Sequence, residues 1–196
     1  VEWVGKKLEG FFGANAAESD AYNRVVNGKH HDRVRSYLED AVQKGANVKH
    51  GGATNKSDAN YFAPTVVTDV PLDSTLMEKE IFGPILPVNS YTDLKEVIDH
   101  INANEKPLAL YIYSKKRKNI DHIIQNTRAG GTCINNNDVH FFNVNLPFGG
   151  VNNSGIGKSH GFYGFQAFSN ARGVYKQHIP GALELLMPPY NDVKQK

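Results

Sequence analysis

The sequence predicts an α/β fold with a parallel sheet, on two observations. Short apolar runs of strand length alternate with amphipathic stretches of helical period between residues 84 and 135. Such alternation is typical of parallel strands joined by crossover helices. The apolar runs are continuous rather than alternating, which indicates a sheet that is buried on both faces.

Two helices are predicted before this region. The first covers residues 1–12, ends at Gly13, and has four apolar side chains on one face: Val1, Val4, Leu8 and Phe11. The second covers residues 30–44, ends at Gly45, and has a similar face: Val34, Tyr37, Leu38 and Ala41. Residues 51–60 are rich in turn formers and predict a polar surface loop. Residues 61–70 predict a strand with a proline near its start.

The alternating region then gives strand, helix, strand, helix, strand, in the order 84–88, 92–104, 108–114, 116–126 and 131–135. The two helices have apolar faces at the helical spacing: Leu94, Val97, Ile98 and Ile101, then Ile120, Ile123, Ile124 and Thr127. Ligands of open α/β sheets bind outside the carboxyl ends of the strands. The polar run 135–140 directly follows the last strand, so a site is expected there.

Composition excludes several classes of protein. The 196 residues carry 22 basic and 20 acidic side chains, a net charge of +2. This balance does not indicate a basic surface that would bind nucleic acid. No stretch approaches the length of a membrane-spanning helix. A single cysteine excludes an internal disulfide framework and indicates a reducing, cytoplasmic compartment. A chain that starts at Val1 inside a helical pattern indicates a fragment of a longer protein, with a processed N-terminus as the alternative.

Cys133, in "GGTCIN", is the only candidate thiol nucleophile. A cysteine within a predicted strand is most often a small buried apolar residue, and a structural role is favoured. The alternative is a thiol enzyme, such as an esterase or thioesterase, that pairs Cys133 with His140. That chemistry requires an exposed thiol within hydrogen-bond reach of the imidazole.

The segment 146–161 contains five glycines, which indicate positive φ angles or close backbone approach. A phosphate cradle, a tight active-site loop and a plain packing turn all remain open. The segment matches neither common nucleotide-binding glycine motif, so the last two are favoured.

Two stretches resemble the aldehyde dehydrogenase superfamily: "MEKEIFGPILPV" (77–88), with its Glu-Ile-Phe-Gly-Pro motif, and "NLPFGGVNNSGIGKSHGFYGFQAFSN" (145–170). The stretch "EKPLALYIYS" (105–114) is also similar to the family. The tail "LLMPPY" (185–190) resembles the branch that oxidises fatty and aromatic aldehydes. In this family the nucleophilic cysteine precedes the Glu-Ile-Phe-Gly-Pro motif, whereas Cys133 follows it. The resemblance therefore makes Cys133 structural.

The resemblance implies the parallel-sheet catalytic domain of the aldehyde dehydrogenase fold, lacking the N-terminal cofactor domain and the nucleophile segment. Residues 1–170 would be the C-terminal part of that domain. Residues 171–179 would be a terminal oligomerisation strand, and residues 180–196 a C-terminal tail. The nucleophilic cysteine and the general-base glutamate are expected upstream of Val1, so the chain alone is expected to be inactive.

For the cofactor, the resemblance implies that Glu80 binds the nicotinamide ribose, that Phe82 lies beside it, and that Arg33 lies near the adenosine ribose. His30 is a weaker candidate beside Arg33. The alternatives are a solvated carboxylate for Glu80, core packing for Phe82 and a solvated helix face for Arg33. Adjacent histidines point to different faces of a helix, so no metal site is expected at His30 and His31.

For the aldehyde, the resemblance implies a pocket lined by Phe148, by Asn136 in the Asn136–Asn137 pair, and by His140. A loop histidine with a backbone partner is the favoured alternative for His140. Ser154 and Gly155 are expected to hold the shape of the glycine-rich loop. Lys158 and His160 receive no role.

The function implied is oxidation of an aldehyde to a carboxylic acid with NAD or NADP, by a full-length protein that forms a homodimer. This chain would supply part of the nicotinamide-ribose and aldehyde pockets. The alternative is a short, catalytically inactive family member that acts as a binding or dimerisation partner.

Overall fold

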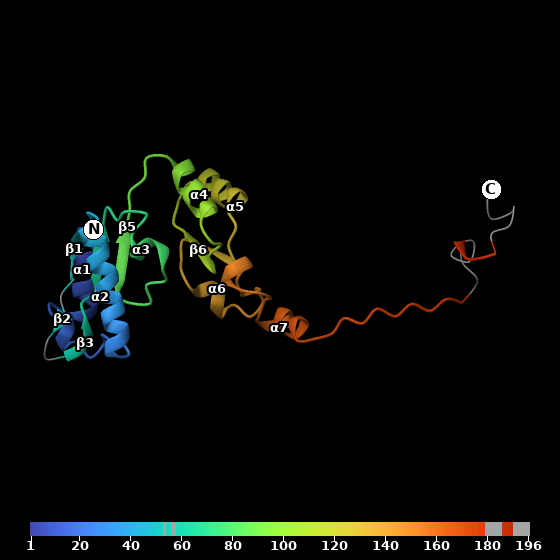
Figure 1. Cartoon of the computed structure of the whole chain (residues 1–196), viewed down its shortest axis with the longest axis horizontal. Helices are drawn as coiled ribbons and strands as arrows, with labels where there is room; N and C mark the ends of the chain where they lie inside the picture. The colour runs from blue at the N-terminus through green and yellow to red at the C-terminus, as the bar shows by residue number, and fades with distance from the viewer. Residues whose placement is uncertain (53, 56–57, 179–185, 190–196) are drawn as a thin grey trace. The chain divides into compact units, whose positions relative to one another are not determined.

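The structure, a computed structural model, describes residues 1–52, 54–55, 58–178 and 186–189. The chain divides into two compact units, Val1–Asp93 and Leu94–Lys196 (Figure 1). Each unit has its own sheet.

The first unit has a three-stranded sheet in the order β1-β4-β5, formed by β1 (Asn47–His50), β4 (Thr65–Thr68) and β5 (Ile85–Val88). β4 pairs antiparallel with β1 and parallel with β5. A separate antiparallel hairpin joins β2 (Thr54–Asn55) to β3 (Asp58–Phe62). The helices of this unit are α1 (Glu2–Phe12), the short 3-10 helix η1 (Ala16–Glu18), α2 (Gly28–Gln43) and α3 (Thr75–Glu78).

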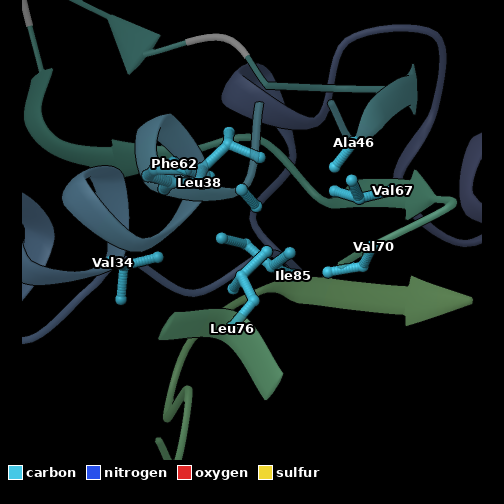
Figure 2. Close-up of a cluster of buried hydrophobic side chains, with 9 residues drawn as sticks. Val34, Leu38, Ala46, Phe62, Val67, Val70, Leu76 and Ile85 are labelled. Carbon is cyan, nitrogen blue, oxygen red and sulfur yellow. The ribbon is translucent and has the colours of Figure 1, made fainter. Parts of the chain in front are cut away.

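The predicted apolar face of the second helix is confirmed. In α2, Val34, Leu38 and Ala41 are buried, and Tyr37 packs beside them. They meet side chains of β3, β4, α3 and β5 in the core of this unit (Figure 2): Phe62, Val67, Leu76 and Ile85. The helix begins where the Asn27 side chain accepts a hydrogen bond from the amide of His30, and Gly45 follows its end with φ of 110°.

The second unit contains one parallel pair of strands, β6 (Ala109–Ile112) and β7 (Gly131–Ile134). The helices α4 (Leu94–Ala103) and α5 (Arg117–Asn126) precede and join them. After β7 come α6 (Val139–Phe142), η2 (Asn152–Ser154) and α7 (Gly161–Ala167). The predicted helix at 92–104 is confirmed, with Ile98 buried. In α5, Ile120 is buried but Ile124 is exposed, because its face is only partly covered in the described chain.

Two predictions about strands are wrong in the described chain. Within the first unit β5 pairs parallel with β4, and within the second unit β6 pairs parallel with β7. The 51–60 segment is no simple loop, because residues 54–55 and 58–62 form a hairpin. The 61–70 strand is split at Ala63–Pro64 between β3 and β4, since proline has no amide to donate to a ladder.

Burial also departs from the prediction. β4 is buried almost throughout, but β6 and β7 are not buried on both faces, and Tyr111 and Ile134 are exposed. Residues 171–178 are exposed and form no strand with any described part of the chain. To act as an oligomerisation strand, residues 171–179 would have to pair with a strand of another subunit. Most of the predicted tail at 180–196 lies outside the described residues. Within the described residues, no helix is both long and apolar enough to cross a membrane.

Candidate functional site

The loop at residues 80–84 presents two side chains outward. Glu80 is exposed, and its carboxylate makes no hydrogen bond or ion pair with any other described residue. Phe82 is 81% exposed and has a positive φ of 42°, in the left-handed region that side chains rarely adopt. The core-packing alternative for Phe82 is therefore wrong within this chain. A carboxylate with both oxygens free can accept hydrogen bonds from two neighbouring hydroxyls.

The backbone of this loop is held from several sides. The Arg33 guanidinium donates from Nη1 to the Glu80 carbonyl and from Nη2 to the Phe82 carbonyl, each at 3.3 Å. Gly83 packs on Val34, where a Cβ would lie 2.6 Å from the valine Cγ2. The Pro84 carbonyl accepts the amide of Thr65 at 2.8 Å. A loop held at successive residues can present exposed side chains in a fixed direction.

A cavity of about 610 Å³ opens beside this loop within the first unit. Its lining includes Phe82, Gly83 and Pro84 of the loop, and His30 of α2. The rest is largely apolar, with side chains from the end of α1, from the segment that joins α1 to α2, and from β3: Phe12, Tyr22, Val25, Val26 and Phe62. The volume lies in the range of small-molecule pockets, roughly 300–1,000 Å³. Two residues assigned to the cofactor from sequence, Phe82 and His30, thus line one cavity.

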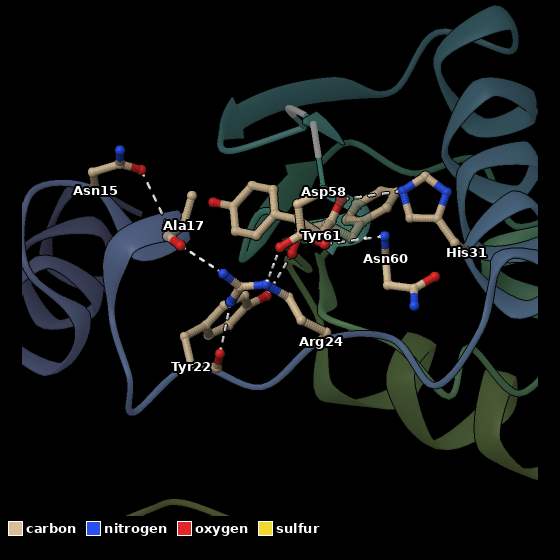
Figure 3. Close-up of polar contacts among 9 residues, drawn as sticks. Asn15, Ala17, Tyr22, Arg24, His31, Asp58, Asn60 and Tyr61 are labelled. Atoms are coloured by element: carbon tan, nitrogen blue, oxygen red, sulfur yellow. Dashed lines mark hydrogen bonds and ion pairs between the residues drawn. The ribbon is translucent and has the colours of Figure 1, made fainter. Parts of the chain in front are cut away.

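Arg24 also lines the cavity. Figure 3 shows its polar contacts. Its Nε donates to the Asp58 carboxylate at 2.6 Å, and its Nη atoms donate to the carbonyls of Tyr22 and Ala17 at 2.8 and 2.5 Å. The guanidinium also lies 5.1 Å from the centre of the Tyr61 ring. These contacts tie the segment before α2 to β3, and no local sequence pattern marks them because the β3 partners Asp58 and Tyr61 lie more than 30 residues from Arg24.

Tyr22 also lines the cavity, and its hydroxyl donates to the Phe62 carbonyl at 2.7 Å. Burial, with a smaller contribution from Tyr61, raises the pKa of Tyr22 to about 12. The phenol is therefore a neutral donor across the ordinary pH range. His31, next to the cavity residue His30, is buried, and its Nε2 lies 3.1 Å from the Tyr61 carbonyl (Figure 3).

The second unit gathers aromatic rings around His140. Its imidazole is 91% buried and lies 5.5 Å from the Phe148 ring and 5.9 Å from the Tyr111 ring, centre to centre. Phe148 stacks on His160 at 5.5 Å and meets Phe141 edge-on at 5.0 Å. Neither ring nitrogen of His140 has a hydrogen-bond partner in the described chain. The backbone-partner alternative for His140 is therefore wrong in this structure, and a buried polar ring without a partner needs an explanation.

Asn136 does not join this cluster through any hydrogen bond. Its side chain is exposed, and its Oδ1 accepts the amide of Asn137 at 2.9 Å. Asn137 donates to Asp138, which also accepts the Tyr111 hydroxyl at 2.8 Å. Burial, and then this hydrogen bond, raise the pKa of Tyr111. The polar run after β7 is thus largely paired with itself and with β6, and it starts α6, which carries His140.

Lys158 holds the glycine-rich loop closed. Its ammonium group donates to three carbonyls, those of Gly149 at 2.5 Å and of Gly130 and Gly150 at 3.1 Å each. All three lysine donors are used, so Lys158 is not available to a phosphate. Residues on either side pair as well, since Phe148 and Ser159 exchange backbone hydrogen bonds. These contacts favour a tight turn that positions Phe148 over a phosphate cradle.

The predicted loop role of Ser154 has a geometric counterpart. Its hydroxyl donates to the Val151 carbonyl and accepts the Val151 amide, both at 2.9 Å. Gly150 lies directly against this turn, because a Cβ there would fall 2.1 Å from the Ser154 carbonyl. Gly155 has φ of 157° and lies against the Gly150 backbone.

Cys133 is buried, with 8% of its surface exposed, in the middle of β7. It has no hydrogen bond to His140, whose ring nitrogens are unpartnered in the described chain. The thiol-enzyme alternative requires both an exposed thiol and that hydrogen bond, so the geometry does not support it.

Comparison with known proteins gives consistent matches. The profile of the aldehyde dehydrogenase family matches residues 6–174. A putative aldehyde dehydrogenase, AldX, of Bacillus subtilis is 47% identical over 156 residues, which cover 80% of this chain and 35% of AldX. Aldehyde dehydrogenase family 3 member A2 of Rattus norvegicus is 40% identical over 196 residues, which cover 99% of this chain and 39% of the relative.

A dimeric NADP-preferring aldehyde dehydrogenase of Rattus norvegicus is 42% identical over 172 residues, 88% of this chain and 37% of that enzyme. The structure of substrate-bound AldH of Staphylococcus aureus superposes with a TM-score of 0.78 at 36% identity, over 92% of this chain and 40% of that one. The chain spans about 35–40% of the length of these relatives. With 169 of its 196 residues inside the family profile, the chain belongs to the aldehyde dehydrogenase family.

Proposed function

We propose that this chain is the C-terminal part of an NAD(P)-dependent aldehyde dehydrogenase that oxidises aldehydes to carboxylic acids. In this proposal the chain supplies the wall of the nicotinamide-ribose site and part of the aldehyde pocket. The observation that carries it is the loop at 80–84, which offers a free carboxylate and an exposed ring beside a cavity of about 610 Å³.

The residues of this loop fit a nicotinamide riboside. The Glu80 carboxylate is exposed and unpaired, so it can accept from both ribose hydroxyls without breaking another bond. The Phe82 ring lines the cavity, where it can cover one face of a flat group. The bound NAD(P)⁺ would supply hydride acceptance, and the protein contributes its orientation.

At the aldehyde end, Phe148 and His140 form part of an aromatic wall. The Phe148 ring offers an apolar surface, and the unpaired nitrogens of His140 offer a donor or an acceptor. Asn136 remains a proposed wall residue on its exposed amide alone. A preference for fatty or aromatic aldehydes belongs to the proposal through the resemblance of the tail "LLMPPY" to that branch of the family.

The thiol nucleophile and the general base would come from sequence upstream of Val1, since Cys133 is buried and unpaired with any base. A homodimer built through residues 171–179 belongs to the same proposal, supported by a relative described as dimeric. A cytoplasmic location is proposed on the lone buried thiol.

Two measurements test this proposal. The coding sequence upstream of Val1 should encode a cysteine segment and a glycine-rich cofactor turn. The isolated 196-residue chain, mixed with an aldehyde and NAD⁺ or NADP⁺, should give no increase in absorbance at 340 nm. Robust oxidation by the chain alone would refute the assignment and would return Cys133 to consideration.

A second candidate is a catalytically inactive family member that pairs with other subunits. It is favoured by α7 and the residue after it, where three phenylalanines are exposed, Phe162 at 68%, Phe165 at 72% and Phe168 at 95%. An exposed aromatic surface of this kind favours contact with another protein segment. A start codon directly before Val1 would favour this candidate over the fragment.

A further inference from the structure

We infer that Arg33 is a positioning residue, which holds the Glu80–Phe82 backbone in its outward-facing form. The inference rests on the proposed function only for what Glu80 and Phe82 then bind. The holding role itself follows from the contacts of the guanidinium.

The Arg33 guanidinium binds two backbone carbonyls of the loop at 80–84. The two Nη atoms of Arg33 reach the carbonyls of Glu80 and Phe82, two residues apart, each at 3.3 Å. Arginine presents its donors in a planar fork, so one guanidinium can bind two acceptors at once. The two carbonyls lie 47 and 49 residues after Arg33 in the sequence, so this side chain joins α2 to the loop at 80–84.

The Arg33 guanidinium is also held by an aromatic ring of its own helix. It lies 5.2 Å from the centre of the Tyr37 ring, one turn further along α2. A cation over an aromatic face at this distance is attracted to it. The ring and the two carbonyls together fix the direction of the Arg33 side chain toward the loop.

The backbone of Phe82 has a strained conformation that other contacts must maintain. Phe82 has φ of 42°, which costs energy for a bulky side chain and persists only when its surroundings enforce it. Phe82 is 81% exposed, so packing of its own ring does not enforce it. The hydrogen bond from Arg33 to the Glu80 carbonyl acts before the strained N–Cα bond of Phe82, and the hydrogen bond to the Phe82 carbonyl and the contact of Gly83 with Val34 act after it.

The test uses the full 196-residue chain and three variants: Arg33→Gln, Arg33→Lys and Arg35→Gln. Arg35 is the matched control, because it lies on the same helix and, among the described residues, forms ion pairs only with Asp32 and Glu39 on the surface. Backbone ¹⁵N relaxation measures the order of residues 80–83. Titration with nicotinamide mononucleotide, followed by amide shifts, measures binding of the nicotinamide ribose.

In Arg33→Gln the order parameters of residues 80–83 should fall from about 0.85 to below about 0.6. The melting temperature and the amide signals of the core should stay as in the control. If the loop then adopts its outward-facing, binding conformation about one tenth of the time, the dissociation constant for the mononucleotide rises about tenfold. Arg33→Lys, with one ammonium for two carbonyls, should give an intermediate loss of order.

Unchanged loop order in Arg33→Gln would overturn the inference, whether or not binding is lost. Loss of binding with an ordered loop would mean that Arg33 contacts the nucleotide directly. If the loop loses order in Arg33→Gln but the mononucleotide fails to bind even the unmodified chain, the positioning role stands and the proposed cofactor site in this chain fails. The two ideas are therefore separated by the two readouts.

Discussion

Gly83, in the loop at residues 80–84, lies so close to Val34 of α2 that a Cβ at position 83 would fall 2.6 Å from the valine Cγ2. Val34 is completely buried in the core of the first unit. The loop that presents Glu80 and Phe82 is therefore seated directly on the main helix of that core, and only glycine allows this approach.

Replacing this glycine should strain the loop and the core together. Gly83→Ala is expected to reduce the free energy of unfolding by about 1–3 kcal/mol, because the added methyl group overpacks a buried contact. Urea unfolding checks this. Gly10→Ala is the control, since nothing lies within 4 Å of a Cβ at that helical position, and it should leave stability equal or slightly higher. Equal effects of the two changes would contradict the close contact.

Asp58 should make the first unit sensitive to acid. The hydrogen bond from Arg24, which is the largest cause, and the amides of Asn60 and Tyr61 lower the pKa of the Asp58 carboxyl, against a smaller opposing effect of burial. A lowered folded-state pKa gives stability that is fully present above the unfolded value of about 3.9. That stability is lost as the pH falls through the folded-state value.

The urea midpoints of the unmodified chain and of Asp58→Asn should therefore differ at pH 6 and converge as the pH falls below about 4. Asp20→Asn is the control, because Asp20 is exposed and makes no contact in the described chain. If the two urea midpoints still differ as much at the lowest pH, the negative charge of Asp58 is not what stabilises its contact with Arg24.

Lys158 should stabilise the glycine-rich loop. Lys158→Met removes three donors from the carbonyls of Gly130, Gly149 and Gly150. We expect a loss of about 1–3 kcal/mol and faster hydrogen exchange at residues 148–159. Lys118→Met, at an exposed lysine of α5 without a contact, is the matched control. If hydrogen exchange at residues 148–159 in Lys158→Met stays as slow as in this control, Lys158 does not stabilise the loop.

The Cys133 thiol should react slowly in the folded chain. It is 8% exposed, so a thiol reagent can reach it only when β7 opens. Labelling in native buffer is expected to be at least about a hundredfold slower than in urea. Labelling at the unfolded rate would mean that the thiol is accessible, and the structural role of Cys133 would be wrong.

Helices could be predicted well because their signal is local. The face of Val34, Leu38 and Ala41 follows from spacing alone, and these side chains are buried as expected. Strand pairing could not be predicted, because β5 reads as an apolar run whichever strand it joins. Its partner β4 is chosen by the core that Ile85 enters.

The residues of the candidate site could be predicted, but the contacts that hold them in place could not. Glu80 and Phe82 came from a motif resemblance, and the structure places them on one loop with Arg33 bound behind them. The contacts of Arg33 and Lys158 are made to backbone carbonyls, which every residue has, so no residue type in the sequence marks them. Their assignment to cofactor and aldehyde remains a prediction.

The most direct test of the central claim is the Michaelis constant for NAD⁺ of a fused enzyme. It joins the N-terminal part of Bacillus subtilis AldX, up to the start of the match, to this chain. Glu80→Gln should raise that constant roughly ten- to a hundredfold, as expected for loss of a charged acceptor. Glu78→Gln, at an exposed carboxylate two residues earlier, should leave it unchanged. An active fusion in which both variants bind NAD⁺ equally well would contradict the claim that this chain forms the nicotinamide-ribose wall.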